Sequence, residues 1–177
     1  MKAATAALAV ATVFFGALPC RAQAGCTRAI ESGFSHCPPA GWTVKAPAAL
    51  GDKFKIFLGP RDGQFTRTVN FQEETDARSL PDHVAASIRT MVESPAKAGA
   101  EKVTVLAQTE FPTASGERGV KLVIHVITRS LTVRAFQYYF SAAGNRKLVG
   151  SCMGLAAAAE LLEPVCDGAM KTFQIDP

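Results

Sequence analysis

Residues 120–141, VKLVIHVITRSLTVRAFQYYFS, hold two apolar stretches joined by a short polar segment. In residues 120–127, apolar side chains fall on both faces of an extended chain, which is typical of a strand covered on both sides. Residues 129–130 then lead tightly into a second alternating stretch, 131–141. Strands joined so closely pair antiparallel, so this segment predicts a central part of an antiparallel sheet.

Shorter alternating stretches lie on both sides of this pair. We expect further strands at residues 41–44, 53–58, 65–73, 102–111 and 147–152. The glycines and proline in GPRDG, after the second of these, predict a turn that makes a hairpin with the third.

Two segments change to helical spacing. Ser79-Leu80-Pro81-Asp82 has the S-x-x-D form of a capping box, and the apolar residues after it recur at helical spacing. A second helix is expected from Leu155, with a kink or fresh start at Pro164. Its predicted buried row is Leu161, Val165, Ala169 and Phe173. Strands joined by tight turns, with helices only after the third strand and at the end, predict an α+β fold with a mostly antiparallel β-sheet packed by helices.

The first 24 residues read as a signal peptide. Lys2 supplies a positive start, residues 3–17 are an apolar run too short to span a bilayer, and residues 22–24, AQA, form a small-x-small cleavage site. We therefore predict cleavage after Ala24 and a periplasmic or secreted protein. Lipidation at Cys20 would instead tether the chain to a membrane, but a proline precedes this cysteine where such a site needs a small residue.

The mature chain is expected to form one domain, residues 41–177, after an irregular leader, residues 25–40, that ends in two prolines. No later apolar segment approaches membrane-spanning length. The chain has 19 basic and 15 acidic residues, and two of the basic ones lie in the predicted signal peptide. The numbers of basic and acidic residues in the mature chain are therefore nearly equal. This argues against a nucleic-acid partner, because binding its phosphates needs a concentrated basic face.

Four cysteines remain after this cleavage: Cys26, Cys37, Cys152 and Cys166. An even number in an exported chain predicts two disulfides, because that compartment is oxidising. Proximity in sequence favours Cys26 with Cys37 and Cys152 with Cys166, while the two crossed alternatives stay open. The second of these bonds closes a loop of about 15 residues, worth roughly 3 kcal/mol on the chain-entropy estimate.

One cysteine also has a catalytic interpretation. Residues 150–154, GSCMG, have the G-x-C-x-G outline of a nucleophile elbow with Cys152 as the nucleophile. Such a thiol hydrolase needs a histidine and an acid that follow the nucleophile in the chain. All three histidines, His36, His83 and His125, precede it. We therefore expect a structural disulfide and no enzyme, with a small thiol-dependent hydrolase that uses Cys152 as the alternative.

The remaining polar residues form no recognisable site. His36-Cys37 lacks the ligand spacing of a metal site, and the chain has no phosphate-binding glycine loop, so we predict neither metal nor cofactor. We interpret His125 as an interior or sheet-margin residue, His83 as solvent-facing and Trp42 as core rather than a ligand anchor. Solvated helix faces explain the acidic residues Asp82, Glu93, Glu160 and Glu163. Two interpretations are open for the basic residues of the predicted strands. They either form an anion-attracting patch or, at least as well, protect sheet edges from pairing with other strands. These residues are Arg118, Lys121, Arg129, Arg134, Arg146 and Lys147.

Several loose motifs resemble the PsbP-like group, which includes the extrinsic PsbP subunits of photosystem II and bacterial periplasmic DcrB-type proteins. They are PPAGW at residues 38–42, Ser79-Leu80 with Val84, and KTFQI at residues 171–175. The order of elements is also similar over most of the mature chain. This resemblance implies an antiparallel sheet sandwiched between helices, in a protein that binds or assists an assembly without known catalysis.

The sequence therefore predicts a non-catalytic, exported binding or accessory protein of the cell envelope. Its partner would be an unidentified envelope protein or a small ligand. A carrier of a small apolar ligand is a further alternative. The resemblance transfers no binding residue to this chain, because no set of histidine, aspartate and glutamate matches a metal motif of the group. The four mature cysteines are not part of the group's pattern.

Overall fold

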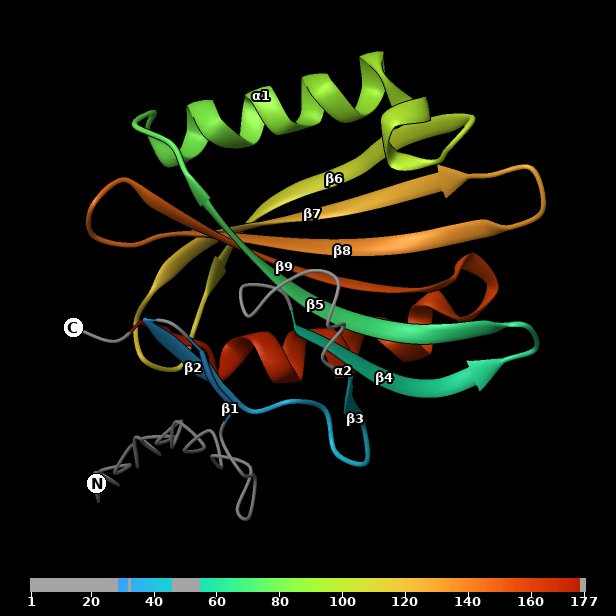
Figure 1. The fold of residues 1–177 in the computed structure, drawn as a ribbon, viewed down its shortest axis with the longest axis horizontal. Coiled ribbons are helices and arrows are strands. Elements are labelled where there is room, and N and C mark those ends of the chain that lie inside the picture. The colour runs from blue at the N-terminus through green and yellow to red at the C-terminus, as the bar shows by residue number, and fades with distance from the viewer. Residues whose placement is uncertain (1–28, 32, 46–54, 176–177) are drawn as a thin grey trace, which may run out of the picture.

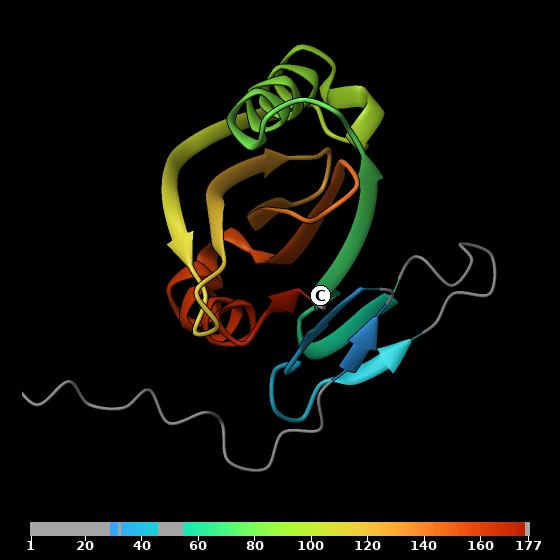
Figure 2. The same ribbon diagram turned by 90° about the vertical axis from the view of Figure 1, so that its left-hand side faces the viewer.

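A curved seven-stranded sheet dominates the fold (Figures 1 and 2). The computed structural model describes residues 29–31, 33–45 and 55–175. All neighbours in the sheet pair antiparallel, as predicted, in the order β3-β4-β5-β9-β8-β7-β6. The strands are β3 (Thr43–Lys45), β4 (Lys55–Asp62), β5 (Phe65–Thr75), β6 (Lys102–Pro112), β7 (Arg118–Ile127), β8 (Thr132–Ser141) and β9 (Arg146–Leu155).

Two runs of consecutive strands make up this sheet. The strands β3, β4 and β5 form one run, and β6 to β9 form the other, with β5 and β9 as the seam. The hairpin of β7 and β8 quoted above lies in the second run, where β7 is one strand from the edge. The central strand is β9, which is buried along most of its length.

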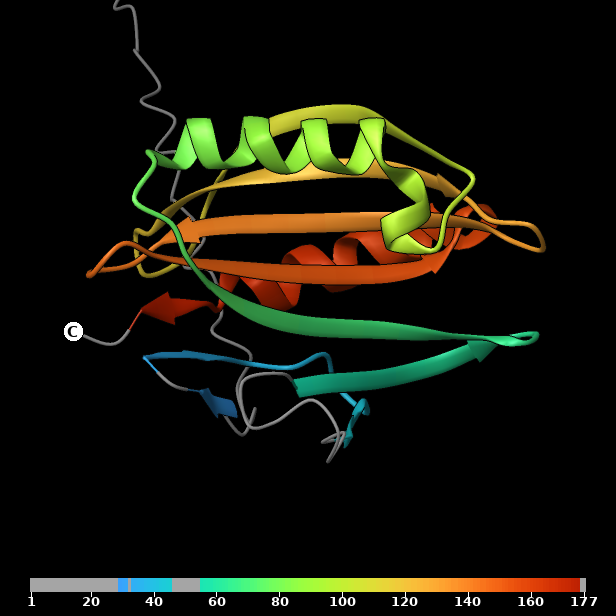
Figure 3. The same ribbon diagram turned by 45° about the horizontal axis from the view of Figure 1, so that its top comes forward.

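One helix connects the two runs. Helix α1 (Leu80–Glu93) begins at Ser79, whose side chain accepts a hydrogen bond from the Asp82 backbone amide. It is followed by the short helix η1 (Pro95–Ala98), and Gly99 then ends the segment in the left-handed conformation at a φ of 69°. Figure 3 shows α1 running along the strands over one face of the sheet. Beneath it lies an apolar cluster built around Val84, Leu122, Ile124, Ala135 and Val149.

The opposite face has a different cover. Helix α2 (Ala159–Lys171), preceded by the short helix η2 (Ala156–Ala158), packs on β8 and β9. A large aromatic cluster fills this side, including Phe71, Phe136, Tyr138, Phe140 and Phe173. Because α2 shares this face with a second, small sheet, the arrangement matches a sheet sandwiched between helices only in part.

The small sheet consists of β1 (Ala29–Glu31), β2 (Phe34–His36) and β10 (Gln174–Ile175), with β2 in the middle. It occupies part of the segment for which we predicted an irregular leader. Strand β2 pairs with β10 at the far end of the sequence, and this is a tertiary contact that local patterning does not encode. Phe34 of β2 stacks on Phe173, which joins the small sheet to the aromatic cluster.

The predicted buried row of the second helix is correct for Ala169 and Phe173, which are buried, and wrong for its first two residues. Leu161 and Val165, expected to be buried, are 70% and 37% exposed. Leu162 and Cys166 instead face the sheet, together with the three residues Ala159, Ala169 and Met170. The helix also continues through Pro164 without a break. Within the described ranges, no helix has the length and apolarity needed to cross a membrane.

Candidate functional site

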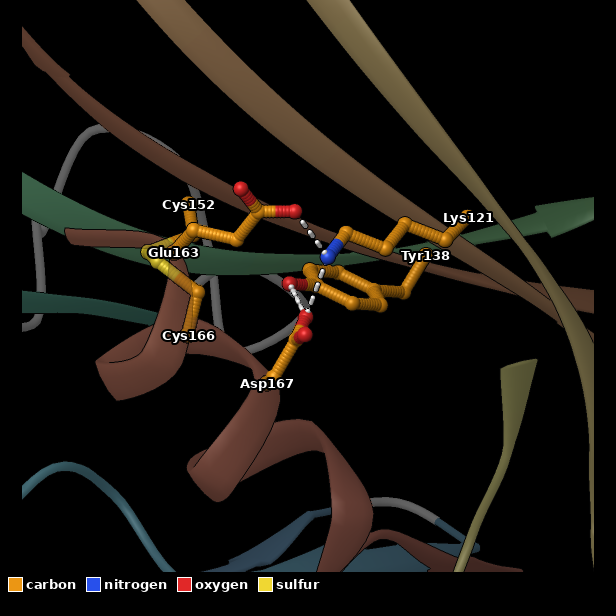
Figure 4. The surroundings of a disulfide bond; sticks show 6 residues. All are labelled: Lys121, Tyr138, Cys152, Glu163, Cys166 and Asp167. Atoms are coloured by element: carbon orange, nitrogen blue, oxygen red, sulfur yellow. Dashed lines mark hydrogen bonds and ion pairs between the residues drawn. A yellow bond between two sulfur atoms is a disulfide. The ribbon is translucent and has the colours of Figure 1, made fainter. Parts of the chain in front are cut away.

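The GSCMG segment lies inside β9 and faces α2. Cys152 is fully buried and forms a disulfide with Cys166, with the two Cα atoms 6.0 Å apart (Figure 4). A sulfur held in a disulfide is neither a thiol nor a thiolate, so Cys152 cannot act as the nucleophile of a hydrolase in this state. Cys37 is disulfide-bonded as well. Because Cys26 lies outside the described residues, its pairing stays a prediction, as does cleavage after Ala24.

The two glycines of GSCMG have a packing role. A Cβ atom on Gly150 would lie 2.9 Å from Sδ of Met170, and one on Gly154 would lie 2.6 Å from Cδ2 of Leu162. Alternate residues of a strand point to the same side, so both glycines and Cys152 face the helix together. The G-x-C-x-G pattern therefore reflects the close approach of α2 to β9, and not a nucleophile elbow.

A charge cluster around the buried Lys121, next to the disulfide, links α2 to the sheet (Figure 4). Lys121 of β7 is only 6% exposed, and its Nζ atom lies 2.7 Å from Oε1 of Glu163 and 2.7 Å from Oδ1 of Asp167. The Tyr138 hydroxyl donates to the same Oδ1 at 2.6 Å. The Lys121 ammonium also lies 5.4 Å from the ring centroid of Phe136. Through these contacts the cluster holds α2 against the sheet.

The sequence places Lys121 and Glu163 on separate surfaces, Lys121 in edge protection or an anion-attracting patch and Glu163 on a solvated helix face. The structure pairs them across 42 residues. The only sequence feature that pointed to this ion pair was a lysine in an otherwise apolar strand. The other basic candidates do not gather with it. Lys147 donates to the backbone oxygen of Asp76, and Arg146 pairs with Glu73.

Burial shifts the titration of both tyrosines of this chain. Burial raises the pKa of Tyr139 to about 12. Burial, followed by the hydrogen bond to Asp167, raises the pKa of Tyr138 far above its usual value. Tyrosines in the unfolded chain ionise near pH 10, so stability contributed by the protonated forms is lost as pH rises from about 10 toward 12.

We therefore expect no tyrosinate absorbance from the folded protein near pH 10. A spectrophotometric titration measures this directly, because Tyr138 and Tyr139 are the chain's two tyrosines. The same protein in concentrated urea is the control and should titrate with a midpoint of about 10. A folded-state midpoint near 10 for either tyrosine would contradict the buried environment described here.

His83 differs from its predicted position. It is 2% exposed rather than solvent-facing, and its Nδ1 atom lies 2.7 Å from Oδ2 of Asp76. Hydrogen bonds from Arg78, and then the one with His83, hold the pKa of Asp76 well below its usual value. The burial has a tertiary cause, because the His83 ring packs edge-to-face on Tyr139 of β8. The His83 ring makes its hydrogen bond with Asp76, and its Nε2 atom has no hydrogen-bond partner within the described residues.

His36 is buried against the rings of Phe57 and Phe71, while His125 is half-buried in β7. The described part of the chain contains no group of three histidine, cysteine or acidic residues placed to hold a metal ion. His36, His83 and His125 thus lie in three separate structural contacts.

The best candidate for contact with another molecule is the outer face of α2. We define this surface by its exposed and half-buried residues, Glu160, Leu161, Glu163, Pro164, Val165, Asp167, Gly168 and Lys171. Among the described residues, Leu161 is the most exposed large apolar side chain. Val165, which is also exposed, follows one helical turn later. An exposed apolar pair of this kind on a helix indicates a contact surface when further apolar residues adjoin it.

A groove adjoins this face on one side. It has a volume of about 280 Å³ and is open to solvent. Six of its lining residues are Pro39, Trp42, Pro60, Arg67, Val165 and Gly168. The Trp42 ring packs against Gly59, where any side chain would collide with it. The half-buried Trp42 thus forms one wall of the groove, so its interpretation as core holds only in part.

Gly168 has no structural requirement to be glycine. It lies in the last turns of α2 with a helical backbone, and a Cβ atom there would meet nothing within 4 Å. Glycine in a helix is less favourable than alanine because its unfolded backbone has more freedom. We expect Gly168→Ala to raise the free energy of unfolding by about 0.5–1 kcal/mol. Urea denaturation measures the change, with Gly154→Ala as a contrasting variant that should destabilise; a loss of stability in Gly168→Ala would contradict the open surface.

Comparison with known proteins agrees with the fold. No known family profile and no curated protein matches the chain. The solution structure of the cyanobacterial PsbP protein from Synechocystis sp. PCC 6803 is similar with a TM-score of 0.62 and 11% identity, over 91% of this chain and 98% of that one. The chain has a PsbP-like fold.

Two further solved structures share this PsbP-like fold. The Ran-binding protein Mog1p of Saccharomyces cerevisiae has a TM-score of 0.56 and 13% identity, over 85% of this chain and 96% of its own. A Pseudomonas aeruginosa protein of unknown function has a TM-score of 0.59 and 16% identity, over 77% and 98% of the two chains. Identities this low support the fold alone.

Proposed function

We propose that this protein is a non-catalytic binding or accessory protein of the cell envelope that contacts a partner protein through the outer face of α2. The observation that carries the proposal is the exposed pair Leu161 and Val165 beside the groove at Trp42. The fold leaves this pair uncovered although the same helix buries a complete second apolar row. Apolar side chains exposed next to an aromatic-lined groove are common anchors of protein interfaces.

Two observations disfavour the alternative functions. The disulfide removes the thiol that a hydrolase would need at Cys152. The groove is open to solvent and does not enclose its contents, which disfavours a carrier that shields an apolar ligand from water. The Ran-binding activity named for Mog1p supports protein binding as a use of this fold only by analogy.

Site-specific photo-cross-linking tests this function. A photoreactive amino acid at Leu161 is expected to form an adduct with one partner protein when the full chain is expressed in its own host. The matched control carries the same amino acid at Val92, an exposed aliphatic residue of α1 on the other side of the sheet. Adducts of equal yield and identity at both positions, or none at Leu161, would overturn the proposal.

Export is a separate part of the proposal and rests on the sequence of residues 1–24. We expect protein purified from the host envelope to begin at Gly25, which N-terminal sequencing or intact mass measurement establishes. Recovery of the protein from the cytoplasm with its first 24 residues intact would contradict export. A mass matching a lipidated Cys20 would replace soluble export with membrane anchoring.

A further inference from the structure

The outer face of α2 carries two residues that weaken a helix. Gly168 follows Pro164 by four residues, so the two lie on the same side of the helix, and both are exposed. Proline lacks an amide hydrogen, so the carbonyl of Glu160 receives no helical hydrogen bond from position 164. Neither residue carries a long side chain. Both line the hollows on either side, so together they form a strip of short side chains along α2 that a second backbone can approach.

The two sides of this strip differ in chemistry. On one side lies the groove with Trp42, Pro39 and Pro60, and its one charged residue, Arg67, forms two hydrogen bonds with Asp62. The other side is acidic. It carries a row of three acidic residues at positions i, i+3 and i+7, namely Glu160, Glu163 and Asp167.

Lys121 does not neutralise all the carboxylates of this acidic row. It contacts one oxygen each of Glu163 and Asp167, and Glu160 forms no ion pair within the described residues. Lys171, at the end of the helix, adds one positive charge near the acidic row. The exposed surface thus presents more acceptor oxygens than cations, so it favours donors such as the ammonium or guanidinium groups of a partner.

We propose that this strip binds a basic and apolar segment of a partner polypeptide. Its apolar side chains contact Trp42 and Val165, and its lysines or arginines pair with Glu160 and the outer oxygens of the acidic row. Asp167 lies seven positions after Glu160, about 10 Å along the helix at 1.5 Å per residue, a distance that about three residues of an extended chain span. An anionic membrane surface or a nucleic acid would meet like charge here. This inference rests on the proposed function.

Fluorescence of Trp42, the single tryptophan of the chain, reports occupancy of the groove. The probe is a soluble ten-residue peptide that contains three lysines and three leucines. The comparison peptides replace every lysine by glutamate or every leucine by serine. We expect only the lysine and leucine peptide to shift the Trp42 emission, and added salt to weaken its binding. Equal binding of the glutamate peptide would overturn the proposal.

Variants locate the binding on the strip. Glu160→Lys is expected to weaken binding by about tenfold or more, and Gly168→Leu to abolish it, because a side chain then occupies the strip. Glu93→Lys and Ala85→Leu are the matched controls, since both residues are exposed on α1. Equal effects of the strip variants and their controls would overturn the proposal. Circular dichroism checks that each variant is folded.

Two other outcomes separate this inference from the proposed function. If the cross-linker at Leu161 captures a partner whose linked segment is acidic, the partner chemistry is wrong and the binding function stands. If neither the cross-linker nor any peptide detects binding, both fail. Sedimentation tests a second copy of the chain as the occupant. A dimer that Gly168→Leu dissociates would overturn the inference.

Discussion

Replacing Cys152 and Cys166 together by alanine lowers the free energy of unfolding by about 3 kcal/mol. The disulfide joins residues 14 positions apart and restricts the unfolded chain. In the folded protein it ties the middle of α2 to the central strand β9, in a fully buried position. Urea unfolding followed by circular dichroism measures the loss. Substitution is preferable to reduction, because Cys37 is disulfide-bonded as well.

The single variants provide the control for this prediction. Either Cys152→Ala or Cys166→Ala removes the bond, so each should lose nearly as much stability as the double variant. If the stability loss of the double variant equals the sum of the losses of the two single variants, the two side chains act independently. A double variant within about 0.5 kcal/mol of the native protein would contradict the structural role of the disulfide.

The second large effect is expected at Lys121. Lys121→Met keeps much of the apolar stem but removes the ammonium group, which leaves the Glu163 and Asp167 carboxylates without the cation that both contact. We expect a loss of about 2–4 kcal/mol, less than for a fully buried pair because both carboxylates are partly exposed. The measurement is again urea unfolding at neutral pH.

A second substitution separates charge from packing. Adding Asp167→Asn to Lys121→Met removes one of the two uncompensated charges and should recover part of the loss. Lys171→Met is the matched control on the exposed surface of α2, with an expected change within about 0.5 kcal/mol. If Lys121→Met changes stability no more than Lys171→Met, the cluster does not hold the helix as described.

The sheet was predictable because its signal is local. Alternation in residues 65–73, the apolar stretch 120–127 and the turn residues between strands locate β5, β7 and their neighbours to within a few positions. The S-x-x-D pattern likewise located the start of α1. Antiparallel pairing follows from short connections, so the fold class needed no information about distant contacts.

The orientation of α2 was not predictable in the same way. The helix has two apolar rows, one with Leu161 and Val165 and one with Leu162, Cys166 and Met170. Periodicity alone does not rank them. The disulfide to Cys152 and the close packing against Gly154 turn the second row toward the sheet. Had the cysteine been used to choose the buried row, the exposed row would have followed from the sequence.

Tertiary contacts account for the other differences. The small sheet depends on a two-residue strand at the end of the chain, which is too short to leave a pattern. His83 is buried because Tyr139 and Asp76 approach it from other elements. The groove beside the candidate surface combines residues that lie far apart in the sequence, among them Trp42, Pro60 and Val165. Such a combination becomes visible only once the chain is folded.

The most direct test of the central claim compares two variants against the partner identified by cross-linking at Leu161. Isothermal titration calorimetry measures the affinity of that partner for Leu161→Ser/Val165→Ser and for Val92→Ser, each in the full mature chain. We predict that the first variant binds at least about tenfold more weakly than the native protein, as expected for apolar anchors of an interface, and that the second binds equally well. Unchanged affinity of Leu161→Ser/Val165→Ser would show that the outer face of α2 is not the contact surface.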